Sequence, residues 1–470
     1  MTDCAPPFAW PEPARTAQSA RRTPQARQAG SRRAVATRTA RAVRAARTTC
    51  SRPSWLVALV VLSIGIPSGS RTPGQGVDVT AGDMASVLLV FVAAYLLVTR
   101  RVTMPRAALP AFGPMVAVLG ITTVCSAAIL SSLPGFVRNA QIFVLVPLAV
   151  VVLVRDRRDL AIVCSSVLAL GLAESAYGIW QSATRNGASL DGENIRAVGT
   201  FGAVDVMAMS IVAGIAFLIL TVFALSARER GRAALVAALL GLGVLGAALV
   251  LALSRGTWLA LGAAAVLTLV LFDRRVAVKV VACCCALLFL APTVVGDGSG
   301  AVAERARSMA ASVGDPDRSV RDRYHLWGAA VRIWQDNPVT GVGVKNFPHY
   351  RDAYAGIELS SGSETADPVR GYVRQPLLSP HNEYLLFLAE QGALGLAGLA
   401  ALLGALVSGL WTRRDVRDPF WLVGVALLTF LLVNFVYADL GGPTCALFSV
   451  VLGIVACRAF AEPPGGEARP

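Results

Sequence analysis

The sequence has little charge for its length. Of its 470 residues, 15% are Asp, Glu, Lys or Arg and 55% are hydrophobic, whereas a soluble domain usually carries about 25% charged residues. This deficit excludes an ordinary cytosolic enzyme and a chain that is disordered throughout. The apolar residues fall in long runs, and a helix needs a run of about 20 to cross a bilayer. The sequence therefore predicts an all-α, polytopic membrane protein.

Histidine and metal-binding patterns are also scarce. The chain has three histidines, and its nine cysteines show neither the spacing of a metal site nor that of a disulfide framework. Asp315-Pro316-Asp317 resembles a metal-binding DxD motif, but two aspartates at this spacing are common in polar loops. We therefore expect no metal and no cofactor.

The apolar runs predict about twelve transmembrane helices. Only Ser254 and Arg255 interrupt the stretch 233–272, so its division into two spans rests on that pair. The expected spans run near residues 55–69, 82–99, 107–130, 135–154, 159–181, 203–225, 233–253, 256–272, 276–295, 382–411, 419–437 and 441–460. An even number of spans places both ends of this membrane domain, 55–460, on one side of the membrane.

Positive charge follows every second span. The loops after the second, fourth, sixth, eighth and tenth spans are basic, whereas the loops between them are mostly poor in Lys and Arg. By the positive-inside rule, the basic loops and both termini are cytoplasmic, and the protein is a multi-pass protein of the cytoplasmic membrane. The segment 296–380 is then a large outer loop, and 461–470 is a short C-terminal tail.

Residues 1–54 differ from the rest of the chain. They hold eleven arginines against Asp3 and Glu12, which gives them +9 of the net charge of +14. Because they are rich in Ala, Ser, Thr and Pro and lack apolar periodicity, we expect a disordered cytoplasmic tail. Its alternative role is contact with anionic membrane lipids. No aromatic residues alternate with the arginines, so nucleic acid is not an expected partner.

The outer loop contains one clear periodic segment. Val320, Tyr324, Trp327, Val331 and Trp334 recur at helical spacing, which predicts an amphipathic helix over 320–336 that lies on the bundle or on the lipid surface. Asn337-Pro338 ends this helix, and a tight turn follows at Gly341-Val342-Gly343. Because the other loops are short, function is expected in this outer region.

One histidine has a suggestive position. His381 follows Pro380 immediately before the tenth span, so we expect it to begin a helix at the outer interface. A neutral imidazole there can act as a general base near pH 7. The alternative is a histidine that only caps the helix or anchors the span.

Several arginines are expected on the same side. Arg255 separates two apolar runs, Arg196 lies in an outer loop, and Arg321 and Arg323 begin the amphipathic segment. Arginine binds phosphate in a bidentate manner, so these residues favour an anionic lipid-phosphate substrate. Snorkelling to the interface or loop ion pairs are the alternatives.

Two ionisable residues fall inside expected spans. Arg138 lies in the fourth span and Glu174 in the fifth, and charged groups at membrane depth are candidates for function. The alternative is that each pairs within the bundle, with the other residue or with the backbone.

The order of these motifs resembles the O-antigen ligase and polymerase superfamily. The likeness covers about 55–460, and the twelve-span plan with a large outer loop agrees with it. The motifs are Arg196-x-x-Gly199-Thr200-Phe201-Gly202, Ser254-Arg255-Gly256, Arg323-Tyr-His-Leu-Trp327, Asn337-Pro338-Val-Thr-Gly341-Val-Gly343 and His381-Asn382-Glu383-Tyr384.

The resemblance implies a GT-C-like, metal-independent, inverting glycosyltransferase. Its donor would be a glycan on undecaprenyl diphosphate, and its acceptor a hydroxyl of another glycan or of a lipid. The family's catalytic histidine corresponds to His381, and the arginines that hold the diphosphate correspond to Arg196, Arg255 and Arg323, with Arg321 as a further candidate. Asp205 departs from the family pattern, which often has Asn after the Gly-Thr-Phe motif.

The resemblance leaves ligase and polymerase open, because they differ only in the acceptor. Either would serve a cell-surface polysaccharide. The rival function is a secondary transporter or a flippase of lipid-linked glycans, which also commonly has around twelve spans. Transporters place ionisable groups at the midplane in repeat-related broken helices, whereas the charged motifs here gather at the outer face.

Overall fold

A computed structural model describes residues 52–67, 79–190, 194–202, 205–227, 231–294, 318–356, 359, 363–367, 371–375 and 377–461. The chain divides into two units, Met1–Arg52 and Pro53–Pro470, and the second is described below. Most of the predicted tails, residues 1–51 and 462–470, and the Asp315-Pro316-Asp317 motif lie outside the described residues.

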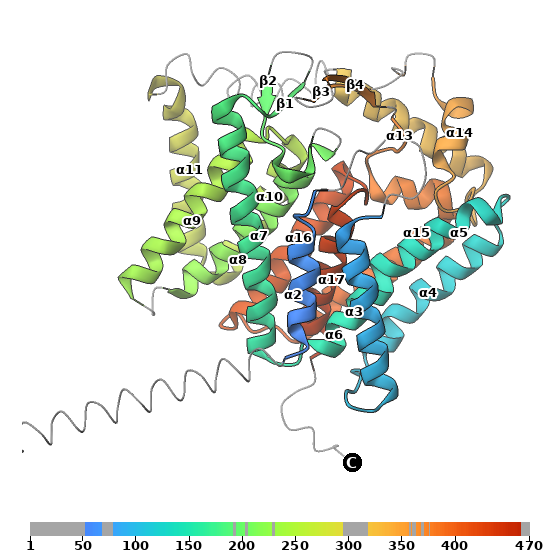
Figure 1. Ribbon diagram of the computed structural model, residues 1–470, viewed down its shortest axis with the longest axis horizontal. Helices are drawn as coiled ribbons and strands as arrows, with labels where there is room; N and C mark the ends of the chain where they lie inside the picture. Colours follow the sequence, from blue (N-terminus) through green and yellow to red (C-terminus); the bar gives the residue numbers. More distant parts are fainter. Residues whose placement is uncertain are drawn as a thin grey trace, which may run out of the picture. The chain divides into compact units, whose positions relative to one another are not determined.

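The predicted helical membrane class is confirmed, and each expected span coincides with a helix (Figure 1). Within the described residues, eight helices are long and apolar enough to cross a membrane, and three more are apolar but shorter. The break at Ser254 and Arg255 separates two helices, as predicted. In chain order the helices are α2 (Ser54–Ser63), α3 (Ala81–Val98), α4 (Ala108–Val124), α5 (Ile129–Ala140) continued by η1 (Gln141–Leu145) and α6 (Val146–Leu153), α7 (Arg157–Thr184), α8 (Ala208–Ala227), α9 (Arg232–Leu251), α10 (Arg255–Phe272), α11 (Arg274–Val294), α15 (Glu383–Thr412), α16 (Pro419–Tyr437) and α17 (Thr444–Ala459).

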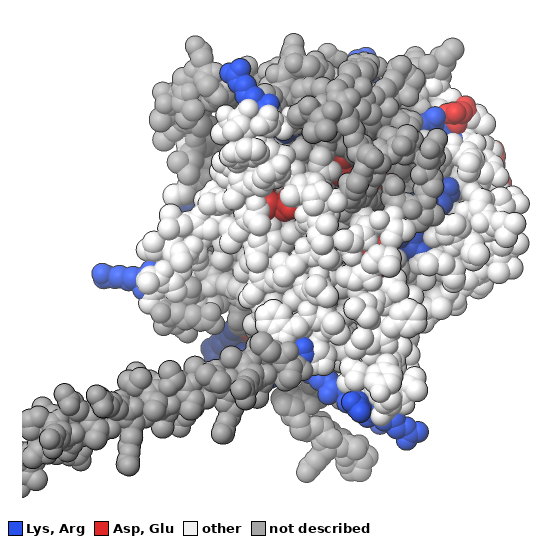
Figure 2. Space-filling model, in the orientation of Figure 1, with Lys and Arg blue, Asp and Glu red and all other residues white. Residues whose placement is uncertain are grey.

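The start of α2, the start of α7 and the end of α17 meet at one end of the bundle. The Ser54 hydroxyl donates to Asp159 Oδ1 at 2.9 Å, and the Cys457 thiol lies 3.9 Å from the carbonyls of Val150 and Val154. This is the end to which the sequence assigns its basic loops. On the face drawn in Figure 2, most of the described surface is uncharged and only scattered Lys, Arg, Asp and Glu side chains are visible, as expected for helices that contact lipid.

Four short strands at the other end were not predicted. They form an antiparallel sheet in the order β2-β1-β3-β4, in which Ser189 of β1 pairs with Ala366 of β3. The strands are β1 (Ala188–Leu190), β2 (Asn194–Arg196), β3 (Ser363–Asp367) and β4 (Gly371–Gln375). The sheet joins the loop after α7, which contains Arg196, to the loop before α15, which contains His381.

The amphipathic helix is confirmed as α13 (Arg318–Asp336). Its Leu326, Ala330 and Ile333 are buried in a small core with Ala389 of α15, and Phe347, the first residue of α14 (Phe347–Tyr354), belongs to the same core. The predicted turn is also present, because Gly341 and Gly343 both have positive φ. An added Cβ at Gly341 would collide with the Glu390–Gln391 backbone, so only glycine permits this approach.

The same loop breaks α15. Gly392 has φ 65° inside that helix, and the backbone amides of Ala393 and Leu394 donate to the carbonyls of Pro338 and Val339. The buried Glu390 carboxylate accepts the backbone amides of Lys345 and Phe347 at 2.8 and 3.1 Å. The segment between α13 and α14 is therefore fixed to the helix whose start follows His381.

Candidate active site

His381 lies just outside α15. The predicted helix start at His381 is wrong by two residues, because α15 begins at Glu383 and the Asn382 side chain accepts the Leu385 amide at 3.0 Å as its N-cap. His381 has φ 49°, a left-handed conformation that is uncommon for a residue with a side chain. Such strain is found where the surrounding structure fixes a functional side chain.

The partner of His381 is an aspartate from the loop between α16 and α17. Its Nδ1 lies 3.4 Å from Asp439 Oδ1, and the histidine side chain is 36% exposed against 18% for the aspartate. Burial opposes ionisation of Asp439, but hydrogen bonds from His381 and Ser379 outweigh it and lower the pKa of Asp439 to about 2. The carboxylate is therefore anionic at neutral pH. A carboxylate that accepts Nδ1–H leaves the lone pair of the imidazole on Nε2.

The loop that carries Asp439, residues 438–443, is held at two positions shortly after that residue. The Leu440 amide donates to the buried Glu383 Oε2 at 2.7 Å. Arg138 Nη2 donates to the Gly442 carbonyl at 3.3 Å. Gly442 has φ 60°, and a Cβ there would collide with the Asp205 carboxylate. Asp205, where the family pattern often has Asn, thus lies against this loop.

Arg255 is the first residue of α10 and is half-buried. Ser254, at the N-cap position, is buried and shares a hydrogen-bond chain with Thr257 at 2.9 Å, which continues to Ser210 of α8 at 3.0 Å. The next residue, Gly256, packs on the end of α16, since a Cβ there would lie 2.7 Å from Tyr437 Cβ. Tyr437 is two residues before Asp439, so Arg255 and the His381–Asp439 pair lie in the same region.

Arg196 ends strand β2 and is 6% exposed. Its Nε donates to the Ala252 carbonyl at 3.0 Å, and its Nη2 donates to the Leu253 carbonyl at 3.5 Å. These carbonyls follow α9 immediately before Ser254, and Leu253 has φ 51°. The guanidinium therefore supports the turn that presents Arg255.

The Gly-Thr-Phe motif is anchored by α7. The Thr200 amide and hydroxyl donate to the Glu174 carboxylate at 2.8 and 2.7 Å, and Gln181 accepts the amides of Val198 and Gly199. Glu174 is 3% exposed. Of the alternatives for Glu174, its contact with a backbone amide is present, whereas Arg138 pairs with Asp83 and not with Glu174.

The amphipathic helix α13 reaches His381 through Trp327. The Trp327 indole donates to the carbonyl of Pro380 at 2.9 Å. Arg323 is half-buried one helical turn before Trp327, and the two residues share a face of α13. Arg321 is exposed on the same helix. Of these two arginines, Arg323 is thus on the side of α13 that contacts the segment of His381.

Residues 240–400 match a family model described as O-antigen ligase. This segment of the chain is thus similar to the O-antigen ligase family. The matched segment contains Arg255, Arg321, Arg323 and His381, whereas Arg196 and Asp439 lie outside it. No curated protein matches the chain. The family supports a glycan-transferring function in a membrane, of the O-antigen ligase or polymerase type.

Around the ligase motifs, the structure reveals partners that the sequence analysis missed. Asp439 is the main one, and its sequence signal is an acidic residue directly before Leu440-Gly441-Gly442, between two spans. Among the residues that the structure describes, no three His, Cys, Asp or Glu side chains gather as a metal site would require.

Proposed function

We propose that this protein transfers a glycan from undecaprenyl diphosphate to an acceptor hydroxyl on the outer face of the cytoplasmic membrane. The observation that carries the proposal is the His381–Asp439 pair, which lies where the Arg255 and Arg323 segments converge. The transfer serves a cell-surface polysaccharide, either by ligation or by polymerisation.

In the proposed reaction, the acceptor oxygen attacks the anomeric carbon of the donor sugar. The bond from that carbon to the phosphate oxygen breaks, and its electron pair leaves with undecaprenyl diphosphate. The acceptor proton passes to His381 Nε2, and the anionic Asp439 stabilises the imidazolium that forms. A single displacement inverts the anomeric configuration.

The growing charge on the leaving diphosphate calls for fixed cations. Arg255 is proposed to bind it directly, because α10 also directs its N-terminal backbone amides and positive dipole end toward the same place. Arg323 and the exposed Arg321 are further diphosphate ligands on α13. Arg196 belongs to the same set and also supports the turn before Arg255. A diphosphate leaves without protonation, so the mechanism uses one base, several cations and no metal.

The test is transfer by purified protein in liposomes. An undecaprenyl-diphosphate-linked oligosaccharide and a soluble or lipid acceptor are supplied, and glycan product and released undecaprenyl diphosphate are measured together. We expect both to form in equal amounts, with an inverted anomeric centre, and with no change on adding a chelator. Movement of intact donor between leaflets without product would contradict the proposal and favour the transporter.

Sidedness is part of the proposal, since the site must face outward. In an otherwise cysteine-free protein in intact cells, an impermeant thiol reagent should label Ser361→Cys and leave Ser19→Cys unlabelled. The reverse labelling would place the ligase motifs on the cytoplasmic side and contradict the proposed site.

A further inference from the structure

Arg138 forms a buried ion pair away from the ligase motifs. Its Nη1 lies 2.5 Å from Asp83 Oδ1, and the two side chains are 16% and 7% exposed. Arg138 is in α5, just before the π-helical turn η1, and Asp83 is in the first turn of α3. Such a turn interrupts regular α-helix and is frequent at functional sites. Because a buried ion pair at membrane depth is costly, it calls for a role beyond stability.

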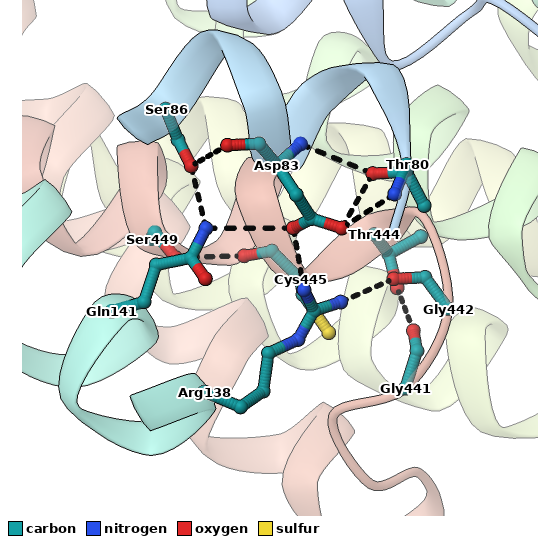
Figure 3. A network of polar contacts seen from close by, with 10 residues as sticks. All are labelled: Thr80, Asp83, Ser86, Arg138, Gln141, Gly441, Gly442, Thr444, Cys445 and Ser449. Carbon is teal, nitrogen blue, oxygen red and sulfur yellow. Dashed lines mark hydrogen bonds and ion pairs between the residues drawn. The ribbon is translucent and has the colours of Figure 1, made fainter. Parts of the chain in front are cut away.

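The two oxygens of Asp83 have separate tasks (Figure 3). Oδ2 accepts from the amide and the hydroxyl of Thr80, each at 2.8 Å, and so completes the cap of α3. Oδ1 faces Arg138 and also accepts from Gln141 Nε2 at 3.5 Å. The carboxylate is thus fixed by the helix start and holds the guanidinium in one orientation.

The other arm of the guanidinium reaches the Asp439 loop. Figure 3 shows Arg138 between Asp83 and Gly442, whose carbonyl accepts from Nη2 at 3.3 Å. Gly442 is three residues after Asp439. Between Asp439 and Gly442, the Leu440 amide donates to Glu383. Asp439 is therefore followed directly by a short segment whose backbone is fixed by Glu383 from α15 and by Arg138 from α5.

We infer that Arg138 is a positioning residue for the reaction: through the Gly442 carbonyl it holds Asp439 in contact with His381, and Asp83 orients Arg138 for this task. The inference rests on the proposed function, because it assumes that Asp439 supports His381 during transfer. Arg138 acts through the 438–443 loop. Asp83 is the fixed end of this chain of contacts and His381 is its reacting end.

The test is a double-mutant cycle of transfer rate between Arg138→Gln and Asp439→Asn in the liposome assay. We expect Arg138→Gln alone to lower kcat about tenfold while KM for the lipid-linked donor stays within about twofold, an effect in the range of directly coupled residues. In the Asp439→Asn protein the same change should cost less than about twofold further, because the contact it maintains is already absent.

Two matched controls separate positioning from general loss of structure. Combined with Arg255→Lys, Arg138→Gln should multiply the losses, since Arg255 acts on the diphosphate and not through Asp439. Gln141→Met removes another contact of Asp83 without touching the 438–443 loop, and it should leave kcat unchanged while lowering the melting temperature. Should Arg138→Gln fail to accumulate, Arg138→Lys serves in its place, because a single ammonium cannot reproduce the guanidinium fork between Asp83 and Gly442.

The outcomes distinguish the two proposals. Multiplicative losses for Arg138→Gln and Asp439→Asn would overturn the positioning role and leave the proposed function intact. Full activity of Asp439→Asn itself would instead contradict the role of Asp439 in the proposed function.

Discussion

One carboxylate flanks each end of α16, and the two have opposite surroundings. At the first end, Asp418 caps the helix by accepting the Phe420 amide and is paired with two arginines, Arg458 and Arg157. At the other end, Asp439 is paired with His381. The arginines keep their charge at any accessible pH, whereas the histidine can gain or lose a proton. In the proposed mechanism, the carboxylate at one end of this helix is structural and the carboxylate at the other end supports the base.

The difference also extends to solvent access. The Asp418 side chain is 1% exposed, and the Asp439 side chain is 18% exposed beside a histidine that is 36% exposed. A substrate can reach the second pair but not the first carboxylate. A buried charged side chain therefore does not by itself indicate the proposed active site. A carboxylate with a titratable, solvent-accessible partner does.

The largest effect is expected from removing the base. His381→Ala should lower glycan transfer about 10²–10⁴-fold, the usual loss when a general base is removed, while the protein still accumulates. Transfer is measured with purified protein at equal amounts. His325→Ala and His349→Ala are the controls, and they should keep most of the activity because neither corresponds to the catalytic histidine of the family motif. Equal losses for all three would contradict a special role of His381.

The next largest effect on transfer rate is expected from substituting the arginines that are proposed to bind the diphosphate. Arg255→Lys keeps the charge but loses bidentate geometry, and should cost about 2.7–4 kcal/mol of transition-state stabilisation, or a hundredfold or more in kcat. Arg196→Lys should cost less, about tenfold, because its guanidinium also serves the backbone of the turn before Arg255. A larger loss for Arg196→Lys than for Arg255→Lys would make Arg196 the main diphosphate ligand.

The two carboxylates themselves should respond differently. Asp439→Asn should lower kcat of the folded protein about tenfold or more, because it alters the orientation of the base. Asp418→Asn leaves Arg458 without its anionic partner in a buried position, and should cost about 3 kcal/mol of folding stability. Its folded fraction should transfer glycan at the wild-type rate. Loss of kcat in folded Asp418→Asn would remove the contrast between the two ends.

The smallest effect is expected on the pH dependence of folding stability. Because the folded pKa of Asp439, about 2, lies below its unfolded value, this residue contributes stability above pH ~3.9 that is lost as pH falls through about 2. Activity should instead be lost on mild acidification, before the fold is, because a protonated imidazole cannot accept the acceptor proton. Transfer rate and circular dichroism between pH 4.5 and 8 should therefore separate, with activity lost while the fold persists. Parallel loss of both would contradict this account.

The spans were predictable because length and hydrophobicity determine them. The runs on either side of Ser254-Arg255 became α9 and α10, and the periodic apolar residues after Val320 became α13. The strands were not predicted, although Asp191-Gly192 is a common hairpin turn signal. Pairing of β1 with β3 joins residues far apart in the chain, and local patterns carry no information about such contacts.

In the candidate site, too, some residues could be predicted from the sequence and others could not. Residue type and motif order pointed to His381, Arg255 and Arg196, because their chemistry is distinctive. Asp439 was missed because it faces His381 only after α15, α16 and α17 pack together. The bond from Arg138 to Gly442 was missed for the same reason, since nothing in the sequence near either residue indicates the other.

The most direct test of the account is chemical rescue of the missing base. Purified His381→Ala protein in liposomes is supplied with lipid-linked donor, acceptor and increasing imidazole at pH 7.5, and product is measured. For His381→Ala, we expect negligible transfer without imidazole and a rate that rises with the concentration of neutral imidazole. The Arg255→Lys protein should show no such rescue. Transfer by His381→Ala at a near wild-type rate without imidazole would contradict the central claim that His381 is the base.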